Sequence, residues 1–353
     1  MDEQSFRQMI SGERQGVASA VLRGLLNAAS WPYGVVARIR NGLFDLGLKK
    51  QQTADVPVIA VGNLTTGGTG KTPIVAWIVQ QLVQAGASPG IVSRGYRADE
   101  SGTNDEKRVL EILCPGVPHV QNPDRVAAVK QIVQDHGVSA VVLDDAFQHR
   151  RIARDLNILL IDATNPFGYD RLLPRGLLRE PVSGLNRADL VLITRTDRVQ
   201  QAELQKIRDQ ICAVAPQLKS RISAVRFAST GLVTKSGESC SASQVEGKRV
   251  AVLTGIGNPE AFAATCVELG ATIAARRFFP DHHHFTKEDV NGVQQMAEQE
   301  NATHILTTLK DLVKLPDNIS NLLAVQIQTT FTDAAAEDLV REEILRVARP
   351  PSH

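Results

Sequence analysis

A loop rich in glycine and threonine between residues 62 and 72 carries the residue types that bind a nucleoside triphosphate. A β-branched apolar run from Val56 to Val61 precedes the loop, and a segment with helical apolar spacing follows it. Glycines let backbone N–H groups converge on phosphate oxygens, and the N-terminus of the next helix adds partial positive charge. This P-loop pattern predicts phosphate binding through Thr65, Thr66, Gly67, Gly68, Thr69, Gly70, Lys71 and Thr72.

Lys71 and Thr72, at the end of this loop, have specific expected roles. The Lys71 ammonium would reach the β and γ phosphates, and the Thr72 hydroxyl would be a ligand of Mg²⁺. The general motif has glycine where this chain has Thr65, so a strict motif search would miss the loop. The alternative is a glycine-rich turn without a ligand, and the position of Gly-Lys-Thr at the junction of strand and helix argues against it.

Two adjacent carboxylates follow another apolar run. The run from Val138 to Leu143 predicts a buried strand, and Asp144 and Asp145 come directly after it. A P-loop enzyme holds its Mg²⁺ at the carboxyl end of such a strand, and a cation or hydrogen bonds would offset the repulsion between the two side chains. The alternative is an acidic pair that begins a helix.

Three consecutive histidines, 282 to 284, follow Asp281. Neighbours on one strand point in alternate directions, and the sequence contains no second cluster of metal ligands. A catalytic or substrate-contacting histidine is therefore favoured over a metal site, with a solvated loop as the alternative. Lys310 and Asp311 close another strand and are candidates for contacts with the nucleotide.

The segments that must position these residues alternate between strand and helix patterns. Apolar runs predict strands at 89–93, 157–162 and 190–194 in addition to those before the P-loop and before Asp144. This alternation predicts an α/β fold with a mostly parallel sheet covered on both faces. The apolar and basic stretch 172–181 would lie in a loop at the carboxyl edge of the strands, where substrates bind in this architecture.

From about Ser223 the alternation starts again, which predicts a second, smaller α/β domain. Its strands are expected at 224–227, 249–254, 272–279, 304–308 and 322–328. Gly255 and Gly257 resemble the start of a dinucleotide-binding fingerprint, but the third glycine is missing. We therefore expect no NAD binding.

Composition limits the possible functions. The chain has 353 residues, of which 43% are hydrophobic, and this is enough for two domains with ample cores. The formal net charge is +1, so no broad field attracts nucleic acid. The four cysteines are isolated, as expected of thiols in a reducing compartment. The acidic and polar start of the chain does not resemble a cleavable signal peptide.

Residues 16 to 50 combine an apolar helical stripe with basic side chains and a single acidic one, Asp45. No uninterrupted apolar run approaches the roughly 20 residues needed to cross a bilayer. Two interpretations remain open from these residues alone. The segment is either an interfacial helix, with Trp31 and Tyr33 at the depth of lipid headgroups, or an amphipathic helix packed on the protein's own core.

Taken together, the motifs resemble the tetraacyldisaccharide 4'-kinase family. These kinases of the lipid A pathway transfer the ATP γ-phosphate to a glucosamine hydroxyl of an acylated disaccharide. The resemblance covers nearly the whole chain and rests on 61–73, 93–96, Asp105-Glu106, Asp144-Asp145, 147–149, 173–174, Arg179-Glu180, 255–259, Asp281-His282 and Lys310-Asp311. The chain departs from the family pattern at Asn104 and Lys107, which flank Asp105-Glu106, and at Ala146 and Leu309.

The resemblance implies two α/β/α domains joined by a two-stranded linker, with ATP and Mg²⁺ held mainly by the first. It also implies a peripheral location on the cytoplasmic face of the bacterial inner membrane, which favours membrane contact for the N-terminal segment. No nucleic acid and no obligate protein partner are expected. The expected divisions are the membrane-facing segment 1–50, the kinase core 51–223, the smaller domain 224–330 with linker strands near 224–228 and 322–328, and a C-terminal helix and tail 331–353.

The resemblance also implies roles for individual residues. Asp105 would be the general base toward the sugar hydroxyl, oriented by His282, and the two would meet when the domains close. Thr72 and Asp144 would serve Mg²⁺, Asp145 would support the site, and Lys310 would contact the nucleotide. The residues expected around the disaccharide are Arg94, Tyr96, Arg125, His149, Arg179 and Glu180.

Two other functions remain possible for the P-loop. A regulatory or chaperone-type NTPase is suggested by the segment 194–197, Thr-Arg-Thr-Asp, which resembles a guanine-recognition box with arginine in place of lysine. Because arginine alters the packing such a box needs, we expect an ordinary loop there. A small-molecule kinase is the second alternative, and it predicts that deleting the first 40 or so residues leaves activity intact.

Overall fold

The computed structural model describes residues 3–95, 104–281 and 283–349. The chain divides into two compact units. The first is formed within 1–95, 116–226 and 330–353, and the second within 96–115 and 227–329.

The first unit is built on a parallel sheet with the strand order β7-β6-β5-β1-β4-β2-β3. The central strand β1 pairs on both sides, with Ile59 opposite Val142 and Leu156. All six residues of β1 are buried, which explains its unbroken apolar sequence. The strands are β1 Val58–Asn63, β2 Pro89–Ser93, β3 His119–Gln121, β4 Ala140–Leu143, β5 Leu156–Asp162, β6 Leu190–Thr194 and the start of β7 Ile222–Val233.

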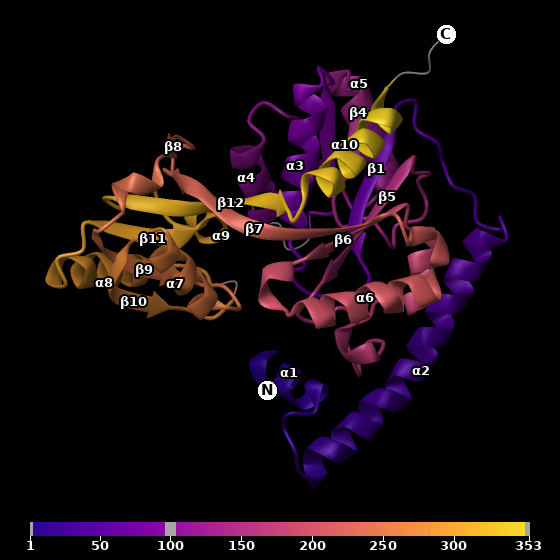
Figure 1. Cartoon of the computed structure of the whole chain (residues 1–353), viewed down its shortest axis with the longest axis horizontal. Helices are drawn as coiled ribbons and strands as arrows, with labels where there is room; N and C mark the ends of the chain where they lie inside the picture. Colours follow the sequence, from indigo (N-terminus) through magenta and orange to yellow (C-terminus); the bar gives the residue numbers. More distant parts are fainter. Residues whose placement is uncertain (1–2, 96–103, 282, 350–353) are drawn as a thin grey trace. The chain divides into compact units, whose positions relative to one another are not determined.

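Helices cover both faces of this sheet (Figure 1). The connections through α5 and α6 run along the sheet in one direction and the connection through α3 runs in the other. Right-handed crossovers therefore place α3 on the opposite face from α5 and α6. The helix α10 packs beside α3, where Trp77 contacts Phe331. The helices are α1 Glu3–Ser11, α2 Val17–Asp45, α3 Lys71–Gln84, α5 Arg125–His136, α6 Gln201–Val214 and α10 Ala334–Ala348.

The second unit has its own parallel sheet, in the order β10-β9-β11-β12. Its core includes Val250, Val252, Phe262 and Leu306. The strands are β8 Ser239–Cys240, β9 Arg249–Thr254, β10 Thr272–Phe278, β11 His304–Thr308 and β12 Leu322–Phe331, and the helices are α4 Asp105–Leu113, α7 Pro259–Glu268, α8 Lys287–Gln299 and α9 Leu309–Leu312. The strands β7 and β12 are sheet neighbours, and each continues from one unit into the other.

The position of α4 differs from the expectation that 51–223 forms one core. Residues 104–115 group with the second unit, because α4 buries Val109, Leu110 and Leu113 and contacts α9. Asp105, the first residue of α4, therefore belongs to the same unit as the segment around Asp281. His282 itself lies outside the described residues, so the expectation that it meets Asp105 when the domains close stays a prediction.

Candidate active site

The P-loop joins β1 to α3 in the expected geometry. Gly67 and Gly70 have φ angles of 111° and 84°, which residues with a side chain rarely adopt. Gly70 occupies the N-cap of α3, and no side chain caps the first backbone N–H groups of this helix. The Thr69 hydroxyl is buried without a hydrogen-bond partner in the described part of the chain. Uncapped N–H groups and an unpaired hydroxyl fit the phosphates of ATP.

Residues at the end of β6 hold this loop by hydrogen bonds to its backbone carbonyls. The Thr194 hydroxyl donates to the Thr69 carbonyl at 3.0 Å, and the Arg195 guanidinium donates to the Gly68 carbonyl at 2.6 Å. Arg195 also pairs with Asp162. Because N–H and C=O point in opposite directions across a trans peptide, these bonds direct the Thr69 and Gly70 N–H groups away from β6. The segment 194–197 is a loop at a strand end, as expected, and its arginine contacts the P-loop.

Lys71 lies between two oxygen groups at the edge of the sheet. Its ammonium is 3.3 Å from Asn63 Oδ1, to which it donates, and 3.6 Å from Asp145 Oδ1. Arg179 donates to both oxygens of Asp145, at 2.9 and 3.0 Å. Burial raises the pKa of Asp145, but Lys71 and Arg179 outweigh burial and hold this pKa below its ordinary value. Asp145 is therefore ionised at neutral pH and keeps two cations beside the P-loop.

Asp144 directly follows β4 and is a buried carboxylate, 6% exposed. The half-buried Thr72 lies in the first turn of α3 at the same carboxyl edge of the sheet. Mg²⁺ prefers hard oxygen ligands and is commonly held by one or two carboxylates together with substrate phosphates. The donor set of Asp144 and Thr72 therefore fits Mg²⁺. Among the described residues there is no group of three or more His, Cys, Asp or Glu that would hold a metal without a substrate.

Several residues expected around the disaccharide surround this centre. Glu180 is 3% exposed and accepts hydrogen bonds from Arg187 at 2.7 Å and from Gln148 at 2.9 Å. Arg125 is also buried, and Asp145 and Asp144 attract its guanidinium. Burial and, after it, the charge of Arg125 lower the pKa of His149 to about 4, so this imidazole is neutral at pH 7. Glu180 is thus held by other side chains of the protein.

The remaining expected residues belong to the second unit or lie outside the described residues. Asp105 is half-buried in the first turn of α4, after the N-cap Asn104, and Lys310 lies in α9. Beside Lys310, the buried Asp311 accepts hydrogen bonds from Thr254, Gly255 and Thr308 at 2.8 to 3.0 Å. Arg94 follows β2 in the first unit. Tyr96 and His282 fall on residues that the structure does not describe.

The clustered histidines beside position 282 include one with a defined structural role. His283 Nε2 lies 2.9 Å from Asp289 Oδ2, and its ring stacks on Phe279 with centroids 4.5 Å apart. Hydrogen bonds to Asp289, first from His283 and then from Thr286, lower its pKa to about 2. His283 therefore ties the segment after β10 to the first turn of α8.

Sequence reasoning assigned no role to Asn63, Gln148, Arg187 or Arg195. Asn63 and Gln148 belong to the motifs that carry the resemblance, and this membership could have marked them as candidate site residues. Arg187 belongs to none of these motifs, although its partner Glu180 lies only seven positions away. Arg195 was considered only as part of the segment 194–197, which gives no sign of its contact with Gly68, 127 positions away.

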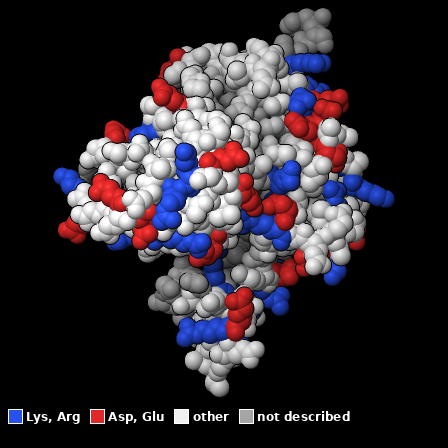
Figure 2. Space-filling view, turned by 60° about the vertical axis from the view of Figure 1, so that its left-hand side comes forward, with Lys and Arg blue, Asp and Glu red and all other residues white. Residues whose placement is uncertain are grey.

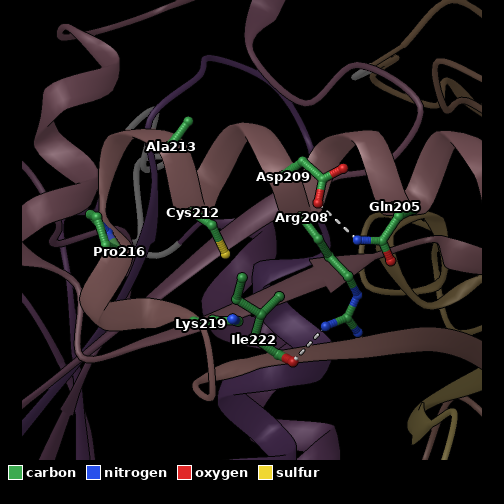
Figure 3. Close-up of a pocket in the computed structure, with 8 residues that line it drawn as sticks. All are labelled: Gln205, Arg208, Asp209, Cys212, Ala213, Pro216, Lys219 and Ile222. Carbon is green, nitrogen blue, oxygen red and sulfur yellow. Dashed lines mark hydrogen bonds between the residues drawn. The ribbon is translucent and has the colours of Figure 1, made fainter.

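A pocket along α6 lies apart from these residues (Figure 3). Three polar side chains of its wall, Gln205, Arg208 and Asp209, form hydrogen bonds within the protein. Gln205 donates to Asp209 at 2.8 Å, and Arg208 donates to the Ile222 carbonyl at 3.1 Å. Because no residue of the P-loop or of the acidic pair lines this pocket, we place the candidate active site at the P-loop.

The chain matches a protein-family model over most of its length. The family model described as tetraacyldisaccharide-1-P 4'-kinase matches residues 22–345. The chain belongs to this family. The resemblance drawn from the motifs is confirmed.

Relatives named tetraacyldisaccharide 4'-kinase occur in several bacteria. The relative from Anaeromyxobacter dehalogenans (strain 2CP-C) is 36% identical over 340 residues, which cover 91% of this chain and 89% of the relative. The relative from Chlorobaculum parvum is 37% identical over 315 residues, which cover 83% and 84%. The crystal structure of the "apo" form of LpxK from Aquifex aeolicus in complex with ATP is 27% identical, with a TM-score of 0.75 over 93% of this chain and 100% of that one. The expected α/β fold of P-loop type is confirmed.

Proposed function

We propose that this protein transfers the γ-phosphate of ATP to the 4'-hydroxyl of a tetraacyldisaccharide 1-phosphate, a step of lipid A biosynthesis. The observation that carries the proposal is the P-loop of a chain that belongs to this kinase family, with Lys71 held beside it by Asn63 and Asp145. The other groups that phosphoryl transfer requires are an oxygen donor set for Mg²⁺ and a carboxylate toward the acceptor.

The P-loop side of the site supplies positive charge. The uncapped N–H groups of α3 and the Lys71 ammonium would bind the β and γ phosphates and stabilise the charge that spreads over the γ-phosphoryl oxygens. Arg179 lies on the other side of Asp145, at 2.9 Å, and Asp145 keeps both cations in place. These groups are arranged before substrate binds, so little reorganisation is needed during the reaction.

Thr72 and Asp144 are the residues that would hold Mg²⁺. When bound, Mg²⁺ neutralises part of the charge on the β and γ phosphates. Asp144 at the end of β4 and Thr72 in the first turn of α3 contribute the carboxylate and hydroxyl oxygens. Asp145 makes its contacts with Lys71 and Arg179 instead.

Asp105 would accept the proton of the sugar hydroxyl. Asp105 lies in the first turn of α4, and the Asn104 side chain caps this turn by accepting from the Lys107 N–H at 3.0 Å. The cap fixes the backbone that carries the Asp105 carboxylate. A carboxylate need only accept a hydrogen bond early in the transfer and the proton late. We assign the orientation of Asp105 to His282 on the basis of the family motif.

The helix α2 has the character of an interfacial helix, which supports a peripheral position on the cytoplasmic face of the inner membrane. At about 100° per residue, six apolar side chains with exposures of 58% to 83% fall within about 140° of its circumference. They are Val17, Val21, Leu25, Trp31, Val36 and Ile39. Arg38 and Arg40 lie at the two borders of this apolar stripe, as expected beside anionic headgroups.

Figure 2 shows the surface where α2 begins in Figure 1. The lowest tip is white, and a blue patch and a red patch of charged residues lie directly above it. No helix in the described ranges 3–95, 104–281 and 283–349 is long and apolar enough to span a membrane.

The test is transfer of labelled phosphate from [γ-³²P]ATP to purified tetraacyldisaccharide 1-phosphate in mixed micelles. We expect labelled lipid from the wild-type chain and none above background from Lys71→Ala. A deacylated disaccharide is the matched acceptor control, and we expect it to be phosphorylated poorly. Equal phosphorylation of both acceptors would indicate a small-molecule kinase, and hydrolysis without transfer would contradict the proposal.

A further inference from the structure

We propose that Tyr33 and Asn41 of α2 are positioning residues for phosphoryl transfer, because they hold Arg179 and Glu180 at the active site. The inference rests on the proposed function and concerns the face of α2 opposite the apolar stripe. Both residues lie within the first unit, as do all the contacts described below.

The two faces of α2 have different partners. The residues opposite the apolar stripe contact the segment 172–180, which ends at Arg179 and Glu180. Ser30 Oγ donates to the Leu172 carbonyl and accepts from the Arg175 N–H, both at 3.0 Å. A Cβ atom added at Gly34 would lie 2.8 Å from Leu172 Cδ1, so the Leu172 side chain would have to shift to make room for it. The helix is thus fastened closely to this segment.

Tyr33 holds the backbone of Arg179. Its hydroxyl donates to the Arg179 carbonyl at 2.7 Å, while the Arg179 N–H donates to the Leu64 carbonyl at 2.8 Å. The main chain of Arg179 is therefore fixed between α2 and the start of the P-loop. Its guanidinium then reaches Asp145, which lies 3.6 Å from Lys71. Three contacts connect the Tyr33 hydroxyl with the lysine of the P-loop.

Asn41 completes the environment of Glu180. Its amide donates to Glu180 Oε2 at 2.8 Å, the oxygen that also accepts from Arg187. Gln148 donates to Glu180 Oε1 and to the Asn63 carbonyl, both at 2.9 Å, and Asn63 in turn accepts from Lys71. A buried carboxylate that loses one of its donors is costly, so removing the Asn41 amide would shift Glu180 and the groups around it.

The arrangement gives α2 two roles on one helix. Its outer face is apolar and suits a lipid surface, while its inner face is polar and orders the residues that line the phosphate site. Because the acceptor is a lipid, the same helix would contact the membrane that holds the acceptor and order the groups that transfer phosphate to it.

The kinetic test uses Tyr33→Phe and Asn41→Ala in the full-length chain, with detergent-dispersed acceptor so that vesicle docking does not contribute. We expect kcat to fall roughly 3- to 10-fold in each variant, the ratio that one lost hydrogen bond produces, while the affinity for ATP stays within about twofold. In an Arg179→Ala background, Tyr33→Phe should cost almost nothing, because the side chain that it positions is gone. The full loss in that background would overturn the inference.

Hydrogen–deuterium exchange tests the same inference without activity. We expect the amides of 172–180 to exchange roughly tenfold faster in Tyr33→Phe and in Asn41→Ala than in the wild-type chain. The matched control is Asn27→Ala, which changes an exposed asparagine of the same helix and should leave exchange unaltered. Unchanged exchange of 172–180 would overturn the inference, whereas absence of phosphate transfer by the wild-type chain would contradict only the proposed function.

Discussion

The guanidinium of Arg195 donates a hydrogen bond to the carbonyl oxygen of Gly68 at 2.6 Å, across 127 positions of sequence. Arg195 follows β6, and Gly68 lies in the P-loop after β1, so the bond joins two strand ends of one sheet. Ordering a glycine-rich loop costs conformational entropy. This hydrogen bond orders the loop before ATP binds, so the phosphate site is preformed.

Removing this brace should weaken ATP binding. We expect Arg195→Ala to raise the dissociation constant for ATP about tenfold, because the loop must be ordered at the moment of binding. Isothermal titration calorimetry measures the change. Arg198→Ala removes an exposed arginine of the same turn and serves as control. Equal ATP affinity in the Arg195→Ala and wild-type proteins would contradict this role.

Asp105 should matter for chemistry and not for nucleotide binding. Asp105→Ala is expected to lower turnover by about 10²-fold or more, as loss of a general base does. The affinity for ATP should stay close to that of the wild-type chain. The matched variant is Glu106→Ala, which removes the neighbouring half-buried carboxylate in the same turn of α4. Transfer of labelled phosphate under single-turnover conditions separates the two, and undiminished transfer by Asp105→Ala would reject the assignment.

The apolar stripe of α2 should bind lipid. Vesicles of phosphatidylethanolamine and phosphatidylglycerol are expected to shift Trp31 emission to the blue, because this side chain is 75% exposed while the chain's other tryptophan, Trp77, is buried. Val21→Asp with Leu25→Asp should weaken vesicle binding at least roughly tenfold. Val267→Asp changes a comparably exposed valine of α7 and is the control. A blue shift that survives in Trp31→Phe would not come from α2.

His149 should make stability depend on pH. Its ordinary pKa of 6.5 falls to about 4 in the folded chain, first through burial and then through Arg125 and Arg154. The unfolded chain therefore binds a proton that the folded chain does not bind between these values. The free energy of unfolding should decrease as pH falls from 6.5 to 4.

Urea unfolding across this pH range measures the effect. His149→Phe should flatten the pH dependence by up to about one bound proton. His136→Asn, which changes an exposed histidine at the end of α5, should leave the slope as it is. An identical slope in the His149→Phe and wild-type proteins would show that His149 is not the group responsible.

Short-range features of this chain could be predicted from the sequence because local sterics determine them. The apolar run before the P-loop, its positive-φ glycines and the helix that begins at Lys71 follow from contacts within about 25 residues. The parallel sheet followed from the alternation of strands and helices, because crossover connections leave few topologies. Asp144 and Asp145 could be placed for the same reason, since they directly follow a buried strand.

The tertiary structure decided which distant groups meet. The sequence analysis placed Asp105 within the kinase core 51–223, but α4 belongs to the second unit, where it contacts α9. The sequence left α2 between two interpretations, and in the structure its polar inner face contacts the segment 172–180 while its apolar outer face remains exposed.

The contacts of Arg195 with Gly68 and of Asn41 with Glu180 illustrate the physical reason. Their partners lie 127 and 139 positions apart, and each contact depends on the register of strands and on the close fit of a helix at Gly34. Local propensity carries no information on such register. The sequence by itself therefore determined the phosphate loop and the family, and only the folded chain determined what holds that loop and its neighbouring cations in place.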